Sequence, residues 1–302
     1  MSLLVVGSIA LDTLRMPGGK EYKDVPGGSC TYFIHSAKFF GKTRVVGVVG
    51  EDFPVKYING FKKAGADLEG LQIQSGTTFQ WHGTYEKDMN NRVTDALYFG
   101  VLGTFDPILP KKYLDSKFIF LACSQPALQM KVLDQVKGKP LAVCDTIEIY
   151  IKENRADLDK LIRRCQGMIV NDSEARLLSG EDNLVRAAAG IVKKYRLEFL
   201  ALKKGEHGGF LATRNGIVPF PAYPLAKIAD PTGAGDCFAG GFMATLAKAG
   251  KADDKTLRKA VVNATAVASC CCEGVSLTSL LKATPAQMRK RAADFIKMTR
   301  LG

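Results

Sequence analysis

Short apolar runs recur along the chain and alternate with stretches in which apolar residues repeat at helical spacing. Runs of three to five consecutive apolar residues, interleaved with helices, predict strands that are buried on both faces of a parallel sheet. The clearest runs are 45–49, 118–122, 141–144, 168–170 and 199–202. The pattern therefore predicts an α/β protein in which helices cover both faces of a mostly parallel sheet. Ligands of such sheets bind beyond the carboxyl ends of the strands.

Two segments depart from this alternation. Residues 13–25 contain the turn signal Pro17-Gly18-Gly19, and residues 77–100 alternate around the polar run 87–92. Turn residues between alternating stretches favour β-structure outside the parallel sheet. We expect one domain spanning residues 1–302, with these two segments as excursions from its core.

Charge and hydropathy narrow the class of protein. The 42 Lys and Arg residues exceed the 30 Asp and Glu residues and give a net charge of +12, but they are dispersed along the chain. This distribution favours attraction of anionic nucleotides over a specific nucleic-acid partner. No apolar span of about 20 residues occurs, and no basic segment precedes the first apolar run, so we expect neither a membrane segment nor a targeting segment.

The eight cysteines show neither Cys-x-x-Cys spacing nor nearby histidines. Such usage disfavours a zinc site or a disulfide framework and favours a reducing, cytoplasmic compartment. We interpret the run 270–272, three cysteines in a row, as small apolar filler at the end of a helix. The alternative is a reactive thiol.

The segment 230–236, Asp-Pro-Thr-Gly-Ala-Gly-Asp, carries the most informative chemistry. It precedes a stretch whose apolar residues repeat at helical spacing up to Gly250. Gly233 and Gly235 lack a Cβ, so the first N–H groups of this helix can approach a bulky anion such as phosphate. A carboxylate at Asp236 suits a group that holds and deprotonates an attacking hydroxyl. The alternative is a glycine-rich turn with Asp236 as an ordinary partner of the helix dipole.

This segment resembles the carboxy-terminal signature of the ribokinase-like (PfkB) carbohydrate kinase family, Asp-Thr-x-Gly-Ala-Gly-Asp, and residues 238–242 extend the likeness. The resemblance implies that the amides of Gly233, Ala234 and Gly235 form an anion hole for the transferred phosphoryl group and that Asp236 is the base. The chain departs from the signature because Pro231-Thr232 replaces Thr-x, which leaves the role of the threonine side chain open. The implied fold is a ribokinase-like three-layer α/β/α core, with a small β-sheet lid formed by about 13–25 and 77–100.

Further matches follow in the chain order of the family. Asp12, after the apolar run 3–11, resembles the aspartate that binds substrate sugar hydroxyls, and Gly27-Gly28-Ser29 resembles the paired glycines at the substrate site and lid hinge. Taken alone, Asp12 also fits a turn residue after a strand, and paired glycines fit an ordinary loop.

Asn171 and Glu174 resemble the Asn-x-x-Glu motif that arranges Mg²⁺ and its waters beside the phosphates of ATP. Hard oxygen ligands and retained waters are what Mg²⁺ prefers. The same residues also satisfy the amino terminus of a helix, with Asn171 or Ser173 as the cap and acidic residues in the first turn. The position after the apolar run 168–170 favours the metal interpretation.

Fewer residues match the family on the side that binds the nucleotide. Lys203, Gly205 and Gly208 follow the apolar run 199–202 and resemble the nucleotide loop, with Lys203 at a position where a threonine is common. A lysine there can pair with a phosphate, and a solvated loop lysine is an equal alternative. Asn263 falls where the resemblance places the adenine pocket.

The residues around the paired glycines bear on the identity of the acceptor. Tyr32 stands where many members of the family carry an asparagine, and it offers an aromatic face to a purine or a core side chain to the following helix. The form Gly27-Gly28-Ser29 looks more like that of adenosine kinases. We therefore expect phosphorylation of a nucleoside, most of all the 5′-hydroxyl of adenosine to give AMP. A kinase of ribose, fructose or a related sugar is the alternative.

Other classes of function remain open on the same residues. A catalytically silent ligand-binding regulator would be marked by loss of the base, and Asp236 is present. A basic nucleic-acid-binding protein would show salt-dependent binding without ATP turnover. The resemblance implies either a monomer or a homodimer that associates through the lid.

Overall fold

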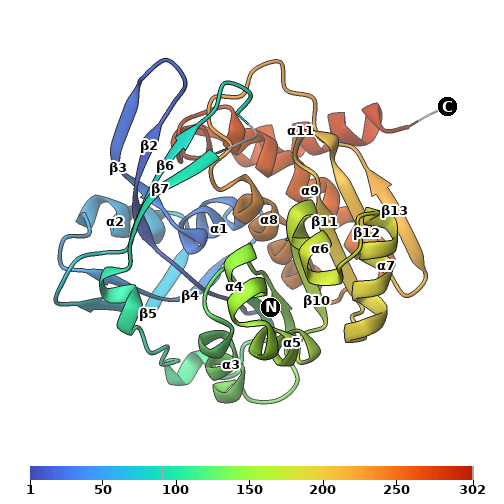
Figure 1. Ribbon diagram of the computed structural model, residues 1–302, viewed down its shortest axis with the longest axis horizontal. Coiled ribbons are helices and arrows are strands. Elements are labelled where there is room, and N and C mark those ends of the chain that lie inside the picture. The colour runs from blue at the N-terminus through green and yellow to red at the C-terminus, as the bar shows by residue number, and fades with distance from the viewer. Residues whose placement is uncertain (90–91, 301–302) are drawn as a thin grey trace.

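The computed structural model describes residues 1–89 and 92–300, and these residues form two sheets with helices packed around the larger one (Figure 1). The large sheet has the strand order β13-β12-β11-β10-β9-β8-β1-β4-β5. Neighbouring strands are parallel except at β11–β12 and β12–β13, which are antiparallel. The mostly parallel sheet expected from the apolar runs is confirmed. Its strands are β1 (Leu3–Val6), β4 (Thr43–Gly50), β5 (Ala66–Gln74), β8 (Phe118–Leu121), β9 (Leu141–Cys144), β10 (Gly167–Asn171), β11 (Phe199–Lys203), β12 (Gly209–Thr213) and β13 (Gly216–Phe220).

Two apolar cores lie on opposite faces of this sheet because successive side chains of a strand point to opposite faces. In β1, Leu3 and Val5 enter one core, whereas Leu4 and Val6 enter the other. The first core is covered by α1 (Ser29–Ala37), α2 (Val55–Lys63), α8 (Ala234–Ala249) and α9 (Asp254–Cys272). The second is covered by α3 (Pro126–Gln135), α4 (Glu148–Glu153), α5 (Arg155–Arg163), α6 (Asp172–Ser179) and α7 (Leu184–Tyr195). Burial of both faces explains why the strands appear in the sequence as continuous apolar runs.

The second sheet, the lid, has the order β3-β2-β6-β7 and stands apart from the large sheet in Figure 1. Its strands are β2 (Ala10–Arg15), β3 (Glu21–Gly27), β6 (Gln80–Tyr85) and β7 (Arg92–Tyr98). The polar turn expected around residues 87–92 includes Asn90 and Asn91, which lie outside the described residues.

The first apolar run of the sequence is divided between the two sheets. The chain leaves the large sheet after Val6, at Gly7, where a Cβ would lie only 2.7 Å from Ser29 Oγ. Asp12 therefore lies inside lid strand β2, and the interpretation of 3–12 as one strand that ends in a carboxylate is wrong.

The carboxyl ends of β9, β10 and β11 and the amino terminus of α8 supply the polar groups of the candidate site described below. Two further helices, α10 (Thr278–Lys282) and α11 (Pro285–Met298), pack beside α9 near the end of the chain. None of the helices in 1–89 and 92–300 combines the length and the apolar character that a membrane span requires.

Candidate active site

Helix α8 begins in a glycine turn. Gly233 occupies the N-cap position with φ of 73°, a left-handed conformation that glycine adopts without strain. The Ala234 N–H donates to the Pro231 carbonyl oxygen at 3.1 Å, so one of the three amides expected in the anion hole already has an acceptor. The Gly235 N–H lies in the first turn of the helix, where amides have no acceptor within the helix itself. This turn, with the positive end of the α8 dipole behind it, can receive an anion.

The Tyr32 ring packs against this turn. The Gly233 backbone lies against the face of its ring, because a Cβ at position 233 would be 2.2 Å from Tyr32 Cγ. The Tyr32 side chain is only 1% exposed and belongs to an apolar cluster with three buried cysteines, Cys237, Cys270 and Cys271. The packing accounts for Tyr32 as a core side chain beneath the glycine turn. Cys270 and Cys271 fill the same apolar cluster, as the sequence suggested.

Asp236 lies in the first turn of α8, directly after these glycines. The pKa of its carboxyl is raised from 3.8 to about 7, mainly by burial and then by the nearby charge of Asp145, whereas Lys203 and Arg92 oppose the increase. A carboxylate with a pKa near neutrality is partly ionised at pH 7 and binds a proton more readily than an exposed aspartate. The position and the pKa of Asp236 both suit a general base.

Three consecutive parallel strands place polar residues beside this turn. Asp145 follows β9, Asn171 ends β10 and Lys203 ends β11, and Asn171 and Lys203 are register partners. The Lys203 ammonium approaches the anion turn, since a Cβ on Gly235 would lie 2.9 Å from its Nζ. Lys203 also lowers the pKa values of Asp145 and Glu174. Its side chain is therefore directed into the site, which disfavours the alternative of a solvated loop lysine.

Glu174 caps the amino terminus of α6 and also faces the site. Its carboxylate accepts the Asn171 N–H at 2.8 Å, and Asn171 Oδ1 accepts the Glu174 N–H at 2.8 Å, a reciprocal capping box. Glu174 is 6% exposed, and burial followed by the charge of Asp145 raises its pKa to about 8. Asn171 and Glu174 therefore cap helix α6, as the alternative interpretation expected. The capping hydrogen bond uses one carboxylate oxygen of Glu174 and leaves the other available, so capping and ligand binding are compatible.

Asp12 enters the site from the lid. Its carboxylate is buried, and its pKa is raised to about 8, with burial as the largest cause and a hydrogen bond from the Trp81 backbone N–H opposing the increase. The negative charges of Asp230 and Asp236 contribute to the raised pKa, which places these carboxylates within electrostatic reach of one another. Asp12 Oδ1 is buried and receives no hydrogen bond from the described residues. A buried acceptor of this kind is expected to find a donor, and a substrate hydroxyl is a fitting one.

The paired glycines bring the chain close to Asp12. A Cβ on Gly27 would lie 1.9 Å from Asp12 Oδ2, and Gly28, with φ of 84°, would place a Cβ 2.7 Å from the Ser8 carbonyl oxygen. Ser29 opens α1, and its N–H donates to Ser8 Oγ at 3.2 Å. Substitution of Gly27 would therefore displace the Asp12 carboxylate, and substitution of Gly28 would displace the backbone at Ser8 and Ile9.

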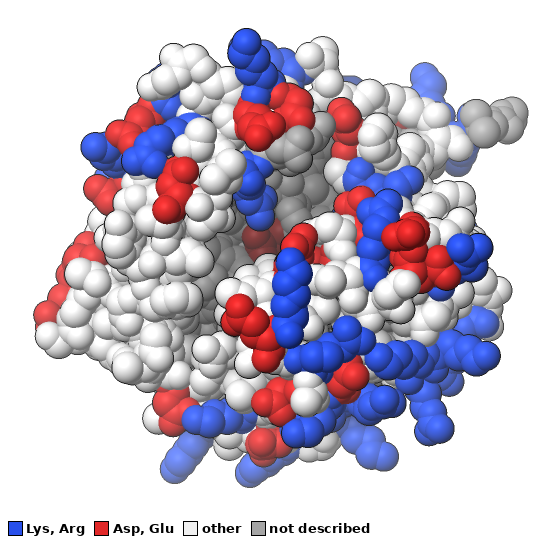
Figure 2. Space-filling view, viewed as in Figure 1, with Lys and Arg blue, Asp and Glu red and all other residues white. Residues whose placement is uncertain are grey.

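Arg92 contributes a positive charge to the site, which the sequence analysis did not predict. It begins lid strand β7, and its charge lowers the pKa values of Asp12, Asp230, Glu174 and Asp236. Figure 2 shows the surface hollowed between the lid and the helices opposite it, with acidic atoms inside the hollow. Asp145, also missed, could have been recognised as a carboxylate directly after the apolar run 141–144.

The remaining nucleotide-side residues lie on loops and on α9. Gly205 and Gly208 have φ values of 56° and 76°, and the Lys204 N–H donates to the Gly208 carbonyl oxygen at 2.7 Å, which closes a tight loop after β11. Asn263, on α9, donates through Nδ2 to Thr245 Oγ1 of α8 at 3.0 Å. This bond joins two helices, and a role of Asn263 at an adenine pocket remains a prediction.

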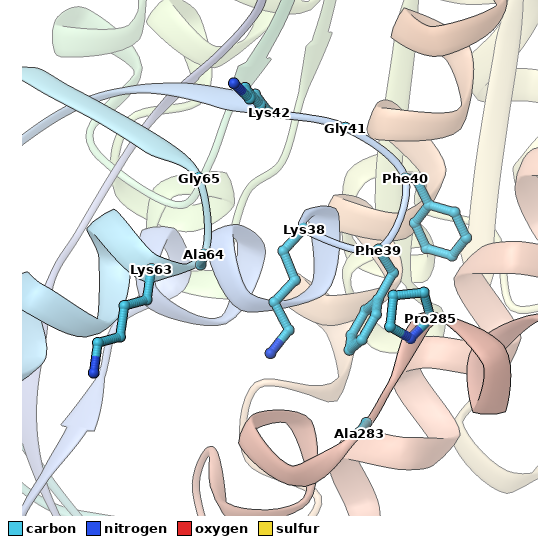
Figure 3. Close-up of a pocket in the computed structure, with 10 residues that line it drawn as sticks. All are labelled: Lys38, Phe39, Phe40, Gly41, Lys42, Lys63, Ala64, Gly65, Ala283 and Pro285. Carbon is cyan, nitrogen blue, oxygen red and sulfur yellow. The ribbon is translucent and has the colours of Figure 1, made fainter.

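A separate groove of about 480 Å³ lies elsewhere, where the carboxyl ends of α1 and α2 meet the start of α11 (Figure 3). Lys38, Lys42 and Lys63 contribute to its lining, together with Phe39 and Pro285. Lysines at helix carboxyl ends stabilise the helix dipole, and Lys38 Nζ donates to the Leu280 carbonyl oxygen at 2.7 Å. The chemistry described above lies at the other end of α1, so this groove is not the candidate active site.

The family model of the pfkB family carbohydrate kinases matches residues 2–283. The chain belongs to the pfkB family of carbohydrate kinases. It is 32% identical over 251 residues to the cytidine kinase of Thermococcus kodakarensis, which covers 81% of this chain and 88% of the relative. The nucleoside kinase of Burkholderia thailandensis in complex with inosine has a TM-score of 0.79 and 20% identity, with 98% of this chain and 99% of that chain covered. An Escherichia coli structure of the ribokinase type, solved with ATP and Mg²⁺, has a TM-score of 0.81 and 19% identity and covers 97% and 99% of the two chains.

Membership of this family confirms the expected ribokinase-like fold and identifies the chain as an ATP-dependent kinase with a hydroxyl acceptor. ATP is the co-substrate, and Mg²⁺ accompanies it. The donor set agrees with a metal that arrives with the nucleotide. Within 1–89 and 92–300, no group of three or more His, Cys, Asp or Glu side chains is arranged to hold an ion by itself, whereas Mg²⁺ commonly binds through one or two carboxylates, waters and phosphate oxygens.

Proposed function

We propose that this pfkB-family kinase phosphorylates the 5′-hydroxyl of a nucleoside. The acceptor oxygen forms a bond to the γ-phosphorus of ATP, the bond from that phosphorus to the bridging oxygen of ADP breaks, and the hydroxyl proton passes to the Asp236 carboxylate. The amides of the glycine turn at Gly233 and Gly235, with the Lys203 ammonium beside them, face the charge of the transferred group. Glu174 would hold Mg²⁺ through water, and the bound metal would neutralise part of the phosphate charge.

The observation that carries this proposal is the environment of Asp236. A carboxylate placed at a phosphate-accepting turn disfavours phosphate as a resting ligand, because like charges repel. The same carboxylate, with a pKa of about 7, can accept a proton when the attacking hydroxyl becomes an ester oxygen. A silent ligand-binding regulator would have no need of this combination.

Asp12 supports a sugar-bearing acceptor. Its Oδ1 is buried without a hydrogen-bond donor from the described residues, and a ribose presents two neighbouring hydroxyls that can donate to one carboxylate. We assign Asp12 to the ribose diol. Gly27 and Gly28 shape the approach to it, as the distances from their absent Cβ atoms indicate.

The nucleobase is assigned from similarity and from the lid. The relative that is 32% identical is a cytidine kinase, which supports cytidine as the first nucleoside to test and gives no support to the expected preference for adenosine. Lid aromatics flank the Asp12 strand: Phe79 and Phe99 pack with ring centroids 5.9 Å apart, and His82 packs on Tyr98 at 5.2 Å. Aromatic surfaces of this kind accept pyrimidine and purine rings alike.

Measurement of ADP release from Mg·ATP tests the function. The purified protein is assayed with cytidine, adenosine, inosine, ribose, fructose and a hexose phosphate, and the product of each active acceptor is identified by mass. Turnover with one or more nucleosides is the expected result. Turnover with sugars alone would overturn the acceptor class but leave the mechanism, and nucleotide binding without turnover across the panel would favour the regulator.

The lid also suggests an assembly. β7 is an edge strand of its sheet, and its residues Val93 and Leu97 are 55% and 44% exposed. Exposed apolar edge strands favour association, and we propose a homodimer through the lid. Light scattering of the wild type and of Leu97→Lys would show a dimer converted to a monomer. An unchanged mass would refute this interface.

The cysteines support a reducing compartment. All eight are free thiols in this structure, six of them buried, so the fold requires no disulfide. We therefore propose a cytoplasmic location.

A further inference from the structure

One buried hydrogen bond joins the lid directly to the catalytic turn. Tyr85 is the last residue of lid strand β6, and its hydroxyl lies 2.6 Å from Thr232 Oγ1, although the two residues are 147 positions apart. Both side chains are buried, with 3% and 9% exposure. Thr232 precedes Gly233, the N-cap of α8, so the lid contacts the turn one residue before the phosphate-accepting amides.

Thr232 is held firmly on its core side. Its N–H donates to Asp230 Oδ1 at 2.8 Å, and its carbonyl oxygen accepts the Cys271 thiol at 3.5 Å. Gly233 then lies against the Tyr32 ring with no room for a Cβ. A displacement of Thr232 would therefore be transmitted to the amides that follow rather than absorbed at position 232.

The Asp230 carboxylate extends this connection to the other half of the lid. Asp230 Oδ2 accepts the Ser276 N–H at 2.7 Å, and Ser276 Oγ donates to the carbonyl oxygen of Pro26, in lid strand β3, at 2.9 Å. Ser276 has φ of 50°, an uncommon conformation for serine that persists only where surrounding contacts fix it. A continuous chain of hydrogen bonds thus runs from Pro26 through Ser276, Asp230 and Thr232 to Tyr85.

We propose that the Tyr85–Thr232 hydrogen bond is a latch that couples the lid to the anion turn. With the lid against the core, the latch holds the turn in the geometry that favours phosphoryl transfer and keeps water from the phosphate. Without it, only the longer route through Ser276 and Asp230 joins the lid to the turn, and the turn is held less firmly. Tyr85 and Thr232 are positioning residues in this scheme, because neither hydroxyl takes part in the chemical step.

The latch predicts a specific failure when it is broken. Water in an open site competes with the acceptor hydroxyl for the phosphoryl group. Loss of the latch should therefore raise ADP formation without an acceptor relative to ADP formation with one. A side chain that serves only folding would lower both rates together through the amount of active enzyme, and their ratio would stay constant.

The test measures this ratio for Tyr85→Phe, Thr232→Val, the double variant and Thr232→Ser. Tyr22→Phe, which makes the same chemical change on lid strand β3, is the matched control. Thermal unfolding of each variant confirms that it is folded. We expect the ratio of hydrolysis to transfer to rise about 3- to 10-fold in both single variants, as loss of one buried hydrogen bond implies. Thr232→Ser, which retains a hydroxyl, and Tyr22→Phe should resemble the wild type.

The double variant decides whether the two hydroxyls act as one unit. Breaking either side already removes the bond, so the double variant should be no worse than the more affected single variant. Additive effects, or an unchanged ratio in folded Tyr85→Phe, would overturn the latch. The inference rests on the proposed kinase activity, and the two fail separately: a wild type without transfer refutes the activity, whereas an active wild type with an unaltered Tyr85→Phe ratio refutes the latch.

Discussion

Replacement of Asp236 by asparagine should slow catalysis strongly and yet stabilise the fold. Asparagine has nearly the shape of aspartate but cannot accept the hydroxyl proton. General-base catalysis contributes about 10²- to 10⁴-fold to a rate, and we expect kcat to fall within that range. The affinity for Mg·ATP should change little, because the amides of the turn and Lys203 remain in place.

The gain in stability follows from the pKa of Asp236. An ordinary aspartate has a pKa of 3.8, and in the fold it rises to about 7. Between these two values the folded protein retains a proton that the unfolded chain has lost, so the contribution of Asp236 to stability falls as the pH rises and levels off above 7. At about 1.4 kcal/mol for each unit of pKa, the ionised carboxylate destabilises the fold by about 4 kcal/mol. Because the site opens to solvent, we expect about half of this value to be realised.

Calorimetry and a coupled ADP assay test both parts. Unfolding entropy scales with chain length, so about 2 kcal/mol in a chain of 302 residues corresponds to a rise in Tm of about 3 °C. The rise should be nearly absent at pH 4 and complete at pH 8. Asp182→Asn, at an exposed position, is the matched control and should change neither rate nor Tm. Near-normal turnover of Asp236→Asn would refute the base assignment, and a lower Tm at pH 8 would refute the electrostatic reasoning.

Three further predictions concern the surrounding charges. In the wild type, kcat/KM should rise with pH through about 7 as Asp236 ionises. Lys203→Met should move this rise to higher pH, because the cation that lowers the pKa of Asp236 is gone. Identical pH profiles of the wild type and the variant would exclude Lys203 from the site. Glu174→Gln should raise the Mg²⁺ concentration that gives half the maximal rate. Its Tm should not fall, since the glutamine amide oxygen can still accept the Asn171 N–H. An unchanged Mg²⁺ dependence would mean that Glu174 only caps helix α6. Asp12→Asn should raise KM for the nucleoside about 10- to 100-fold, as loss of charged hydrogen bonds implies, while the Kd of Mg·ATP alone stays constant; an unchanged KM would remove Asp12 from the acceptor site.

Local patterns predicted most of the core. Both faces of the central strands are buried, so runs such as 141–144 and 199–202 appear without polar interruption and correspond to β9 and β11 nearly residue for residue. The division of the first run at Gly7 was not predictable in this way. Val6 and Ile9 are both apolar and both buried, and the close packing of Ser29 against Gly7 is a tertiary contact that no local pattern encodes.

Motif and strand-end position predicted the groups that belong to the core of the site. Asn171 and Lys203 end strands that the sequence reveals, Glu174 follows in the first turn of α6, and Asp236 lies in the first turn of α8. Arg92 could not be found from the sequence. Its role depends on the fold of the lid over the core, a contact between segments remote in sequence that no local period encodes.

Five carboxyl groups of the site have raised pKa values, and their charge balance links the lid to the catalytic base. Burial is the largest cause for Asp12, Asp145, Glu174, Asp230 and Asp236 alike. Lys203 from the core and Arg92 from the lid are the cations that oppose it. A site with this excess of buried acids is strained when they all ionise, and each cation that approaches relieves the strain. Docking of the lid brings one such cation, Arg92, whose charge lowers the pKa values of four of these five carboxyl groups. Docking should therefore favour the ionised, proton-accepting form of Asp236, and opening of the lid should raise the pKa of that carboxyl.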